Sequence, residues 1–254
     1  MKLDDLTALN SPIHRWEPKT KLIGFLILIF TISFIDRLVL LPATIIVTAI
    51  LFALSKIPFK YLLNRMRLPA FFLAVVGIML IFFSEGVSIF ELGPIRITKE
   101  GFEAFLIISV RFFSIIVLVI VLFGTTQFAK LIKVLRSFGI STILVDMTMF
   151  TYRYLFEIVD QLENMQIAMK LRGFNKRNLK SIPKYVSLIG TIFIRSYEQS
   201  ERVYNAMITR GYGEAAYFHN DFEIKSYDVI WLISIIVISL ILILAQILLR
   251  QLGV

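Results

Sequence analysis

The chain has no cysteine and only two histidines, His14 and His219, in 254 residues. It therefore has no disulfide, no thiolate metal ligand and no cysteine nucleophile. The two histidines lie far apart in the sequence, so we expect no metal site built from protein side chains. The phosphate loop G-x-x-x-x-G-K-[ST], the zinc motif H-E-x-x-H and the nucleophile motif G-x-S-x-G are also missing. These absences argue against an ATPase, a zinc protease and a serine hydrolase.

Charged residues are scarce as well, at 18% of the chain, whereas hydrophobic residues make up 57% and the mean hydropathy is +0.80. This composition is typical of a polytopic membrane protein rather than a soluble domain. The net charge of +9 does not indicate nucleic-acid binding, because the basic residues are scattered between apolar segments. Lys and Arg in cytoplasmic loops explain that charge better.

A helix needs about 20 apolar residues to cross a bilayer. Five segments are candidates: Leu22–Ile35, Leu38–Leu54, Leu68–Ser84, Phe102–Phe123 and Val229–Leu249. Only Asp36 and Arg37 separate the first two, and one helix through both would far exceed the bilayer at about 1.5 Å per residue. We therefore predict a tight hairpin with this pair at its tip. Pro42 and Pro69 are expected in first helical turns, where proline is tolerated.

Lys and Arg are distributed unevenly about these five segments. Of the 27, 22 fall on one side, namely before the first segment, between the second and third, and between the fourth and fifth. An excess of positive charge marks the cytoplasmic side. The pattern predicts a cytoplasmic N-terminus, about five crossings and a C-terminus outside.

The sequence thus suggests an all-α polytopic membrane protein in three parts. A four-span membrane bundle covers 1–123, a cytoplasmic or interfacial helical region covers 124–227, and a C-terminal transmembrane helix covers 228–254. We expect three helices in the middle region, at 126–138, 142–172 and Pro183–Arg210. Gly139 and Gly173 are expected to end the first two, and Pro183 to begin the third. The apolar stretches 142–160 and 182–194 are oily enough to enter the bilayer as a hairpin.

The middle region contains a repeat with an offset of 38 residues: "AMKLRGF" at 168–174 matches "AMITRGY" at 206–212. Such a match indicates a duplicated structural unit. In each copy an arginine lies in the last helical turn and a glycine follows at the position that favours left-handed backbone. One helical face of each copy carries the spacing i, i+3, i+4, i+7. These faces consist of Met165, Ala168, Met169 and Arg172, and of Val203, Ala206, Met207 and Arg210.

Two interpretations of the repeat stay open. The simpler one is a pair of well-terminated helices. The other is a pair of docking ends for a cytoplasmic partner with two equivalent sites, because methionine adapts to a moving surface and arginine binds carboxylates bidentately.

Charge inside the predicted spans is sparse, and Arg111 lies near the middle of the fourth. A charge there needs a partner or a polar cavity. Asp146 or Glu157 is a candidate partner. A structural ion pair is a simpler explanation than a transport path. We include Arg153 with these three as possible intramembrane structural charges.

Several segments carry a family resemblance: "NSPIHRWEPKTKL" (10–22), "TTQFAKLIKVLRSFGIS" (125–141), "FTYRYLFEIVDQLENMQIAMKLRGF" (150–174) and the paired Xaa-Arg-Gly motifs. On these the chain resembles the transmembrane (T) component of energy-coupling-factor transporters, most closely the CbiQ type of cobalt and nickel uptake systems. The family often has alanine before each arginine, where this chain has Leu171 and Thr209.

The resemblance implies a non-catalytic subunit of the prokaryotic cell (inner) membrane. Two ABC-type ATPase subunits would bind ATP, and a separate membrane subunit would capture the substrate, so no cofactor is expected in this chain. The implied ATPase-binding residues are Arg172, Gly173, Arg210, Gly211, Met169, Met207, Ala168 and Ala206. The apolar halves of the same helices would contact the substrate-capturing subunit.

Three alternatives remain beside a cobalt or nickel importer. The cargo of the same kind of complex could be a vitamin, because the residues themselves do not select it. A membrane-embedded enzyme would need an acidic or histidine cluster at the interface. The acids available are Asp146, Glu157, Asp160 and Glu163, and the last three follow one helical strip that looks solvated. A self-contained channel would leave the bulky cytoplasmic helices unexplained.

Overall fold

The computed structural model describes residues 11–83, 88–92, 95–173, 182–212 and 225–251. They form two compact units. The first joins the N-terminal part, up to residue 134, to the C-terminal part from residue 222, and the second covers 135–221. Each unit is described by itself below.

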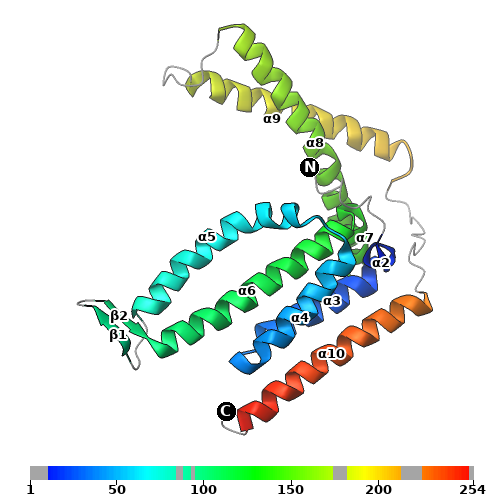
Figure 1. Cartoon of the computed structure of the whole chain (residues 1–254). Helices are drawn as coiled ribbons and strands as arrows, with labels where there is room; N and C mark the ends of the chain where they lie inside the picture. The colour runs from blue at the N-terminus through cyan, green and yellow to red at the C-terminus, as the bar shows by residue number, and fades with distance from the viewer. Residues whose placement is uncertain (1–10, 84–87, 93–94, 174–181, 213–224, 252–254) are drawn as a thin grey trace. The chain divides into compact units, whose positions relative to one another are not determined.

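Unit 1 is a helical bundle whose elements appear in Figure 1. They are α2 (Pro12–Arg15), α3 (Pro18–Ser33), the 3₁₀ turn η1 (Leu38–Leu40), α4 (Leu41–Ser55), α5 (Phe59–Phe83), β1 (Ser88–Leu92), β2 (Ile95–Thr98), α6 (Lys99–Thr125) and α10 (Ser226–Gln251). Helix α6 packs against α3, α4 and α5, and α10 packs against α3. The core gathers Trp16, Phe25, Leu28, Leu118, Val121 and Ile235. Helix α10 follows the whole of unit 2 in sequence. Its Ile235 is nevertheless buried in the core of unit 1, so the chain returns to the first bundle after unit 2.

Four described helices are long and apolar enough to cross a membrane: Leu38–Ser55, Phe59–Leu80, Glu100–Thr125 and Ser226–Gln251. Helix α3 is apolar too but has only 16 residues. The prediction of an all-α protein with about five spans is therefore close to the observed architecture, which has four candidate spans among the described residues. Residues 34–37 form the predicted hairpin tip between α3 and η1, and Pro42 lies in the first turn of α4, as expected.

One expectation for unit 1 is wrong. Pro69 does not lie in a first turn, because α5 begins ten residues earlier, at Phe59, with the polar stretch that the sequence analysis assigned to a loop. Proline has no N–H, so the carbonyl of Arg65 loses its helical donor there, and Figure 1 shows α5 as a curved helix. In the segment between α5 and α6, β1 and β2 pair as an antiparallel hairpin.

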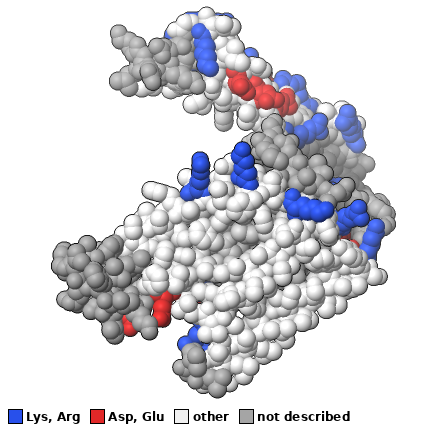
Figure 2. Space-filling model, viewed as in Figure 1, with Lys and Arg blue, Asp and Glu red and all other residues white. Residues whose placement is uncertain are grey.

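The outer surface of the bundle is apolar, as expected of a protein that faces lipid. Phe34, Phe71 and Ile230 are each more than 60% exposed, which is unusual for such side chains in a soluble protein. Figure 2 shows the face of unit 1 turned to the viewer as mostly uncharged, with Lys and Arg side chains along its border.

Unit 2 consists of the end of α7 (Phe128–Ser137) and two long helices, α8 (Thr142–Leu171) and α9 (Ile182–Ile208). Figure 1 shows α8 and α9 crossing, and the two helices are in contact. Their bounds agree closely with the predicted 142–172 and Pro183–Arg210. The predicted stop at Gly139 is confirmed, since this glycine has φ +88°.

Candidate functional site

Both long helices end in a left-handed glycine, which is the predicted feature of the repeat. Gly173 has φ +78° and Gly211 has φ +76°. The N–H of Gly173 donates to the carbonyl of Lys170 at 3.0 Å, and the N–H of Gly211 donates to that of Ile208 at 2.9 Å. After α9 the N–H of Tyr212 also donates to the carbonyl of Met207 at 3.0 Å, which completes a Schellman motif. The two copies thus stop their helices in the same way.

The two repeated faces line two grooves between α8 and α9. The smaller groove, of about 410 Å³, is lined by Met165, Ala168, Met169 and Arg172 of α8 together with Lys184, Ser187, Leu188 and Thr191 of α9. The larger, of about 650 Å³, has Val203 and Met207 of α9 opposite Met147, Thr151 and Tyr154 of α8. In each groove the last turns of one helix therefore face the first half of the other.

Exposure separates the residues of each face into two sets. Met169 and Met207 are half-buried in the grooves, whereas Ala168, Ala206, Arg172 and Arg210 are exposed. Within the described parts of the chain, neither guanidinium group forms an ion pair or a side-chain hydrogen bond. Each helix therefore presents a small residue and a free cation, with methionine packed beneath them.

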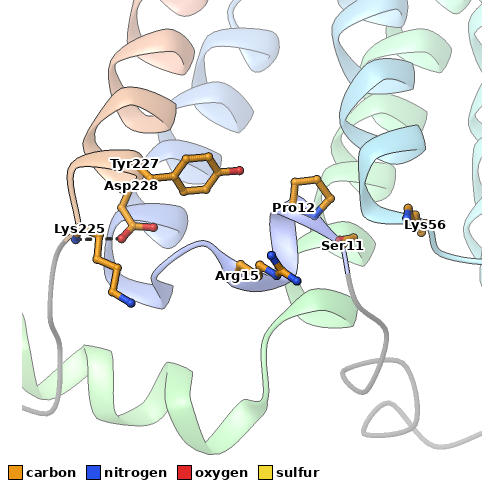
Figure 3. Close-up of a pocket in the computed structure, with 7 residues that line it drawn as sticks. All are labelled: Ser11, Pro12, Arg15, Lys56, Lys225, Tyr227 and Asp228. Carbon is orange, nitrogen blue, oxygen red and sulfur yellow. Dashed lines mark hydrogen bonds between the residues drawn. The ribbon is translucent and has the colours of Figure 1, made fainter.

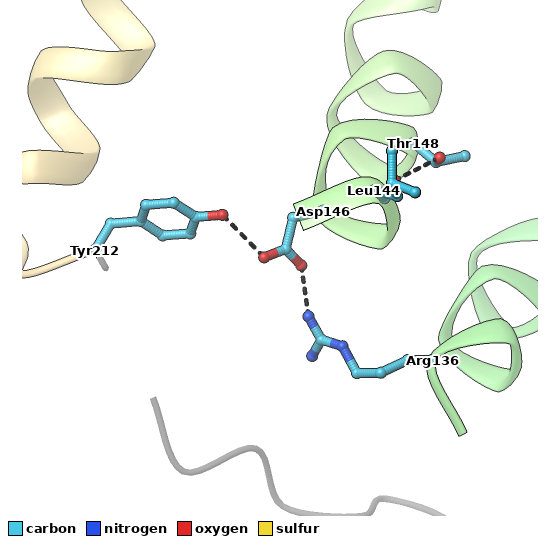
Figure 4. A network of polar contacts seen from close by, with 5 residues as sticks. All are labelled: Arg136, Leu144, Asp146, Thr148 and Tyr212. Carbon is cyan, nitrogen blue, oxygen red and sulfur yellow. Dashed lines mark hydrogen bonds and ion pairs between the residues drawn. The ribbon is translucent and has the colours of Figure 1, made fainter. Parts of the chain in front are cut away.

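Asp146, near the start of α8, connects three segments of unit 2 (Figure 4). Its Oδ1 accepts a hydrogen bond from the guanidinium of Arg136 in α7 at 2.7 Å. Its Oδ2 accepts from the hydroxyl of Tyr212 at 2.9 Å. The hydrogen bond to Asp146 raises the pKa of Tyr212, so the phenol keeps its proton at neutral pH. The Schellman motif at Gly211 thus positions the side chain of Tyr212, whose hydroxyl connects the end of α9 to the start of α8.

We predict that Tyr212→Phe loosens the end of α9 without unfolding the chain. The substitution removes one hydrogen bond to a charged acceptor, a contact that contributes about 1.5–3 kcal/mol, less here because Tyr212 is exposed. Hydrogen exchange at the amides of 207–212 should become faster, while Tyr204→Phe, an exposed tyrosine of α9 with no such bond, serves as the control. Unchanged exchange in Tyr212→Phe would contradict this role.

Arg111 has a different partner from those expected. Its guanidinium donates to the carboxylate of Asp36 and to the backbone carbonyl of Ile35, both at the tip of the α3–α4 hairpin. Asp146 is paired with Arg136 instead, and Glu157 lines the larger groove of unit 2. The sequence does not reveal this pair, because its members are 75 residues apart, and the fold brings the hairpin tip beside the middle of α6.

We predict that Arg111→Gln destabilises unit 1 more than Asp36→Asn does. The glutamine variant leaves the Asp36 carboxylate without a cation and the Ile35 carbonyl without its donor, whereas the asparagine variant keeps the bond to Ile35. The cost of Arg111→Gln is about 1–3 kcal/mol, or several degrees in the thermal midpoint in detergent. Equal midpoints for the two variants would refute this order.

Arg153 and Glu157 were expected as structural charges, and among the described residues neither forms an ion pair. The guanidinium carbon of Arg153 lies 5.7 Å from the centroid of the Tyr154 ring, a cation–π distance. Glu157 shares the larger groove with Arg195. Their assignment to the membrane remains a prediction.

A polar junction that the sequence did not predict lies where α3 and α10 begin and α6 ends. Lys21 is 1% exposed, and its Nζ donates to the Thr126 hydroxyl at 2.9 Å and to the Thr125 carbonyl at 3.3 Å. A cation at a helix C-terminus is stabilised by the unpaired carbonyls. On the other side of the junction, Oδ1 of Asp228 accepts from the N–H of Glu17 at 2.9 Å. The junction depends on contacts between segments that are far apart in the sequence. In the sequence alone, Lys21 is one of several basic residues before the first apolar segment.

Glu17, which precedes the first apolar segment, is 8% exposed, and its carboxyl oxygens have no hydrogen-bond partner among the described residues. Burial, and then the charge of Asp228, raise the pKa of this carboxyl. The folded state therefore favours the protonated form, and its stability falls as the pH rises above the ordinary value of 4.5 towards the raised pKa.

Replacing Glu17 by Gln is therefore expected to stabilise the chain at neutral pH, with little effect near pH 4. The thermal midpoint in detergent, measured from pH 4 to 8, should fall less in Glu17→Gln than in the parent. Each kcal/mol of relief corresponds to about 2–4 °C. Glu163→Gln, at an exposed position of α8, is the control. Parallel pH curves for Glu17→Gln and the parent would contradict a raised pKa of Glu17.

Comparison with known proteins places these features in a family. Residues 9–220 match the family described as CbiQ, cobalt transport protein. An uncharacterized protein of Methanocaldococcus jannaschii is 27% identical over 94% of this chain and 84% of its own length. Proteins named energy-coupling factor transporter transmembrane protein EcfT are similar too. That of Streptococcus equi is 26% identical over 80% of both chains, and that of Macrococcus caseolyticus is 24% identical over 95% of this chain and 97% of its own.

The family match covers α2 through α9 and so includes the helices of unit 1 other than α10 and both repeated helix ends. The EcfT relatives extend the similarity over most of the chain, and the apolar helices agree with a multi-pass membrane protein. The chain belongs to the CbiQ family and is a transmembrane component of the energy-coupling-factor transporters.

Proposed function

We propose that this chain is the non-catalytic coupling subunit of an ATP-driven importer. Two ABC-type ATPase subunits dock on the ends of α8 and α9, and a separate membrane subunit captures the substrate. The chain itself carries no cofactor, and ATP is bound by the partners. It lies in a prokaryotic cell membrane with its N-terminus in the cytoplasm, in agreement with the distribution of Lys and Arg.

One observation carries this proposal: two matched helix ends each expose an arginine without a partner among the described residues. A guanidinium group binds a carboxylate bidentately, and such a charge-assisted contact contributes about 1.5–3 kcal/mol. Ala168 and Ala206, one turn earlier, leave room for a partner surface to approach the helix. Two such ends on one chain suit a partner with two equivalent grooves, such as an ATPase dimer.

The apolar sides of α8 and α9 support a second membrane partner. Ile143 and Met147 of α8 and Val186, Ile189 and Phe193 of α9 are each at least 60% exposed. Side chains of this kind need lipid or an apolar protein surface against them. Because they lie on the same helices as the arginines, a movement of the ATPase subunits would reach the substrate-capturing subunit through α8 and α9.

We propose cobalt or nickel ions as the cargo, supported by the family description and by the Tyr152-Arg153-Tyr154 element of α8. A vitamin importer is the alternative. Affinity purification from native membranes in mild detergent tests the function. Recovery of ABC-type ATPases with a second small membrane protein supports it, whereas repeated recovery of the chain alone contradicts it. Uptake of radioactive cobalt, nickel or vitamins by vesicles that contain the complex then decides the cargo.

A further inference from the structure

Unit 1 contains a cavity of about 570 Å³ beside the junction of α2, α4 and α10 (Figure 3). Its lining includes three cations and one carboxylate: Arg15 of α2, Lys56 after α4, and Lys225 and Asp228 at the start of α10. Ser11, Pro12 and Tyr227 complete it. Three chain segments far apart in sequence therefore bring positive charge to one cavity.

The carboxylate does not neutralise these cations. Asp228 is 3% exposed, and its two oxygens accept from the backbone N–H groups of Glu17 at 2.9 Å and Lys225 at 3.1 Å. Arg15, Lys56 and Lys225 are exposed, and none pairs with a carboxylate within the described ranges. The described residues of the lining thus carry an excess of positive charge, which favours an anion.

The position of the cavity along the bundle indicates the source of that anion. The candidate span Leu38–Ser55 ends next to Lys56, and the candidate span Ser226–Gln251 begins next to Lys225. Both cations therefore lie where apolar helices leave the hydrocarbon. Tyr227 packs edge-on against Trp231, with ring centroids 6.0 Å apart, and such aromatic pairs are typical of the membrane–water interface. The ends of these candidate spans therefore indicate a cavity at the level expected for lipid headgroups.

We propose that this cavity binds the phosphate of an anionic phospholipid, with Arg15, Lys56 and Lys225 around the phosphate oxygens and the acyl chains along the exposed apolar surface of α4 and α10. Arginine and lysine both bind phosphate oxygens strongly, arginine in the bidentate form. The bound lipid would hold α2 against α4 and α10 at the end of the bundle that carries the polar junction.

The test compares two variants of equal charge. Arg15→Gln with Lys225→Gln empties the cavity of two cations, and Arg67→Gln with Lys60→Gln removes an arginine and a lysine from the exposed surface of α5. Purified chain in detergent is titrated with phosphatidylglycerol, with phosphatidylcholine and with inorganic phosphate. Bound lipid is counted by native mass spectrometry and the thermal midpoint is followed.

We expect phosphatidylglycerol to bind and stabilise the parent and the α5 control, and to bind about 25-fold more weakly to the cavity variant, because each cation contributes about five-fold. Equal midpoints of both variants without lipid would show that the cavity variant is folded. If inorganic phosphate alone stabilises the parent and this effect is lost in the cavity variant, the site binds free phosphate, and the proposal of a bound phospholipid is wrong. Equal binding of phosphatidylcholine, or equal losses in both variants, would overturn the site.

Discussion

Reversing both exposed charges, by Arg172→Glu with Arg210→Glu, is expected to release the ATPase subunits from a membrane protein that still folds. The two guanidinium groups make no side-chain contact within the described residues, so the free chain loses little. At a docked surface each substitution removes a contact of about 1.5–3 kcal/mol and adds repulsion. The two together should weaken the complex by at least about 100-fold, measured by co-purification and by titration of ATPase subunits onto the immobilised chain.

Lys60→Glu with Arg67→Glu is the matched control, because it changes the net charge equally on exposed positions of α5. It should retain the ATPase subunits. If the Arg172 and Arg210 reversal keeps full affinity and uptake, the helix ends are not the docking sites. The repeated glycines would then be ordinary helix stops.

Replacing Gly173 and Gly211 by valine is expected to uncouple ATP hydrolysis from uptake. Both glycines have φ near +77°, and a Cβ on either would meet no atom within 4 Å. The penalty is therefore backbone strain, about 1–2 kcal/mol for each residue, rather than a clash. The last turn would rearrange to relieve it and would move the neighbouring arginine. Uptake in vesicles should fall several-fold while the amount of folded protein stays the same.

Two further variants distinguish the effect of backbone strain at Gly173 and Gly211 from the effect of replacing a glycine as such. Gly190→Val, in the middle of α9, also has open space at its Cβ but has no left-handed backbone, and it should leave ATPase binding intact. Gly173→Asn with Gly211→Asn should restore much of the activity, because asparagine tolerates left-handed backbone. Asparagine variants as impaired as the valine variants would show that backbone geometry is not the cause.

The features predicted well from the sequence are those that depend on neighbouring residues. Gly139, Gly173 and Gly211 set their helix ends through local backbone preference, and the bounds of α8 and α9 follow within two residues. The hairpin tip at Asp36 follows from the length of the apolar run. The start of α5 was not predicted, because packing on α6 outweighs both its polar composition and Pro69.

The features that were missed depend on segments far apart in the chain. The contact of Arg111 with Asp36 spans 75 residues, and that of Glu17 with Asp228 spans 211. Charge patterns show that such residues need partners but do not identify them. The Asp146–Tyr212 bond was equally hidden, although the extra hydroxyl in "RGY" relative to "RGF" was a signal that the two copies differ.

That difference makes the two helix ends chemically unequal. A displacement of the chain near Arg210 would act through Tyr212 on Asp146 at the start of α8, which is bonded in turn to Arg136 of α7. Phe174 stands at the matching place of the first copy and has no hydroxyl, so the two copies differ in this one hydrogen-bonding group. A protein bound near Arg210 would therefore act on two parts of unit 2 at once, the end of α9 and the start of α8, through the side chain of Tyr212.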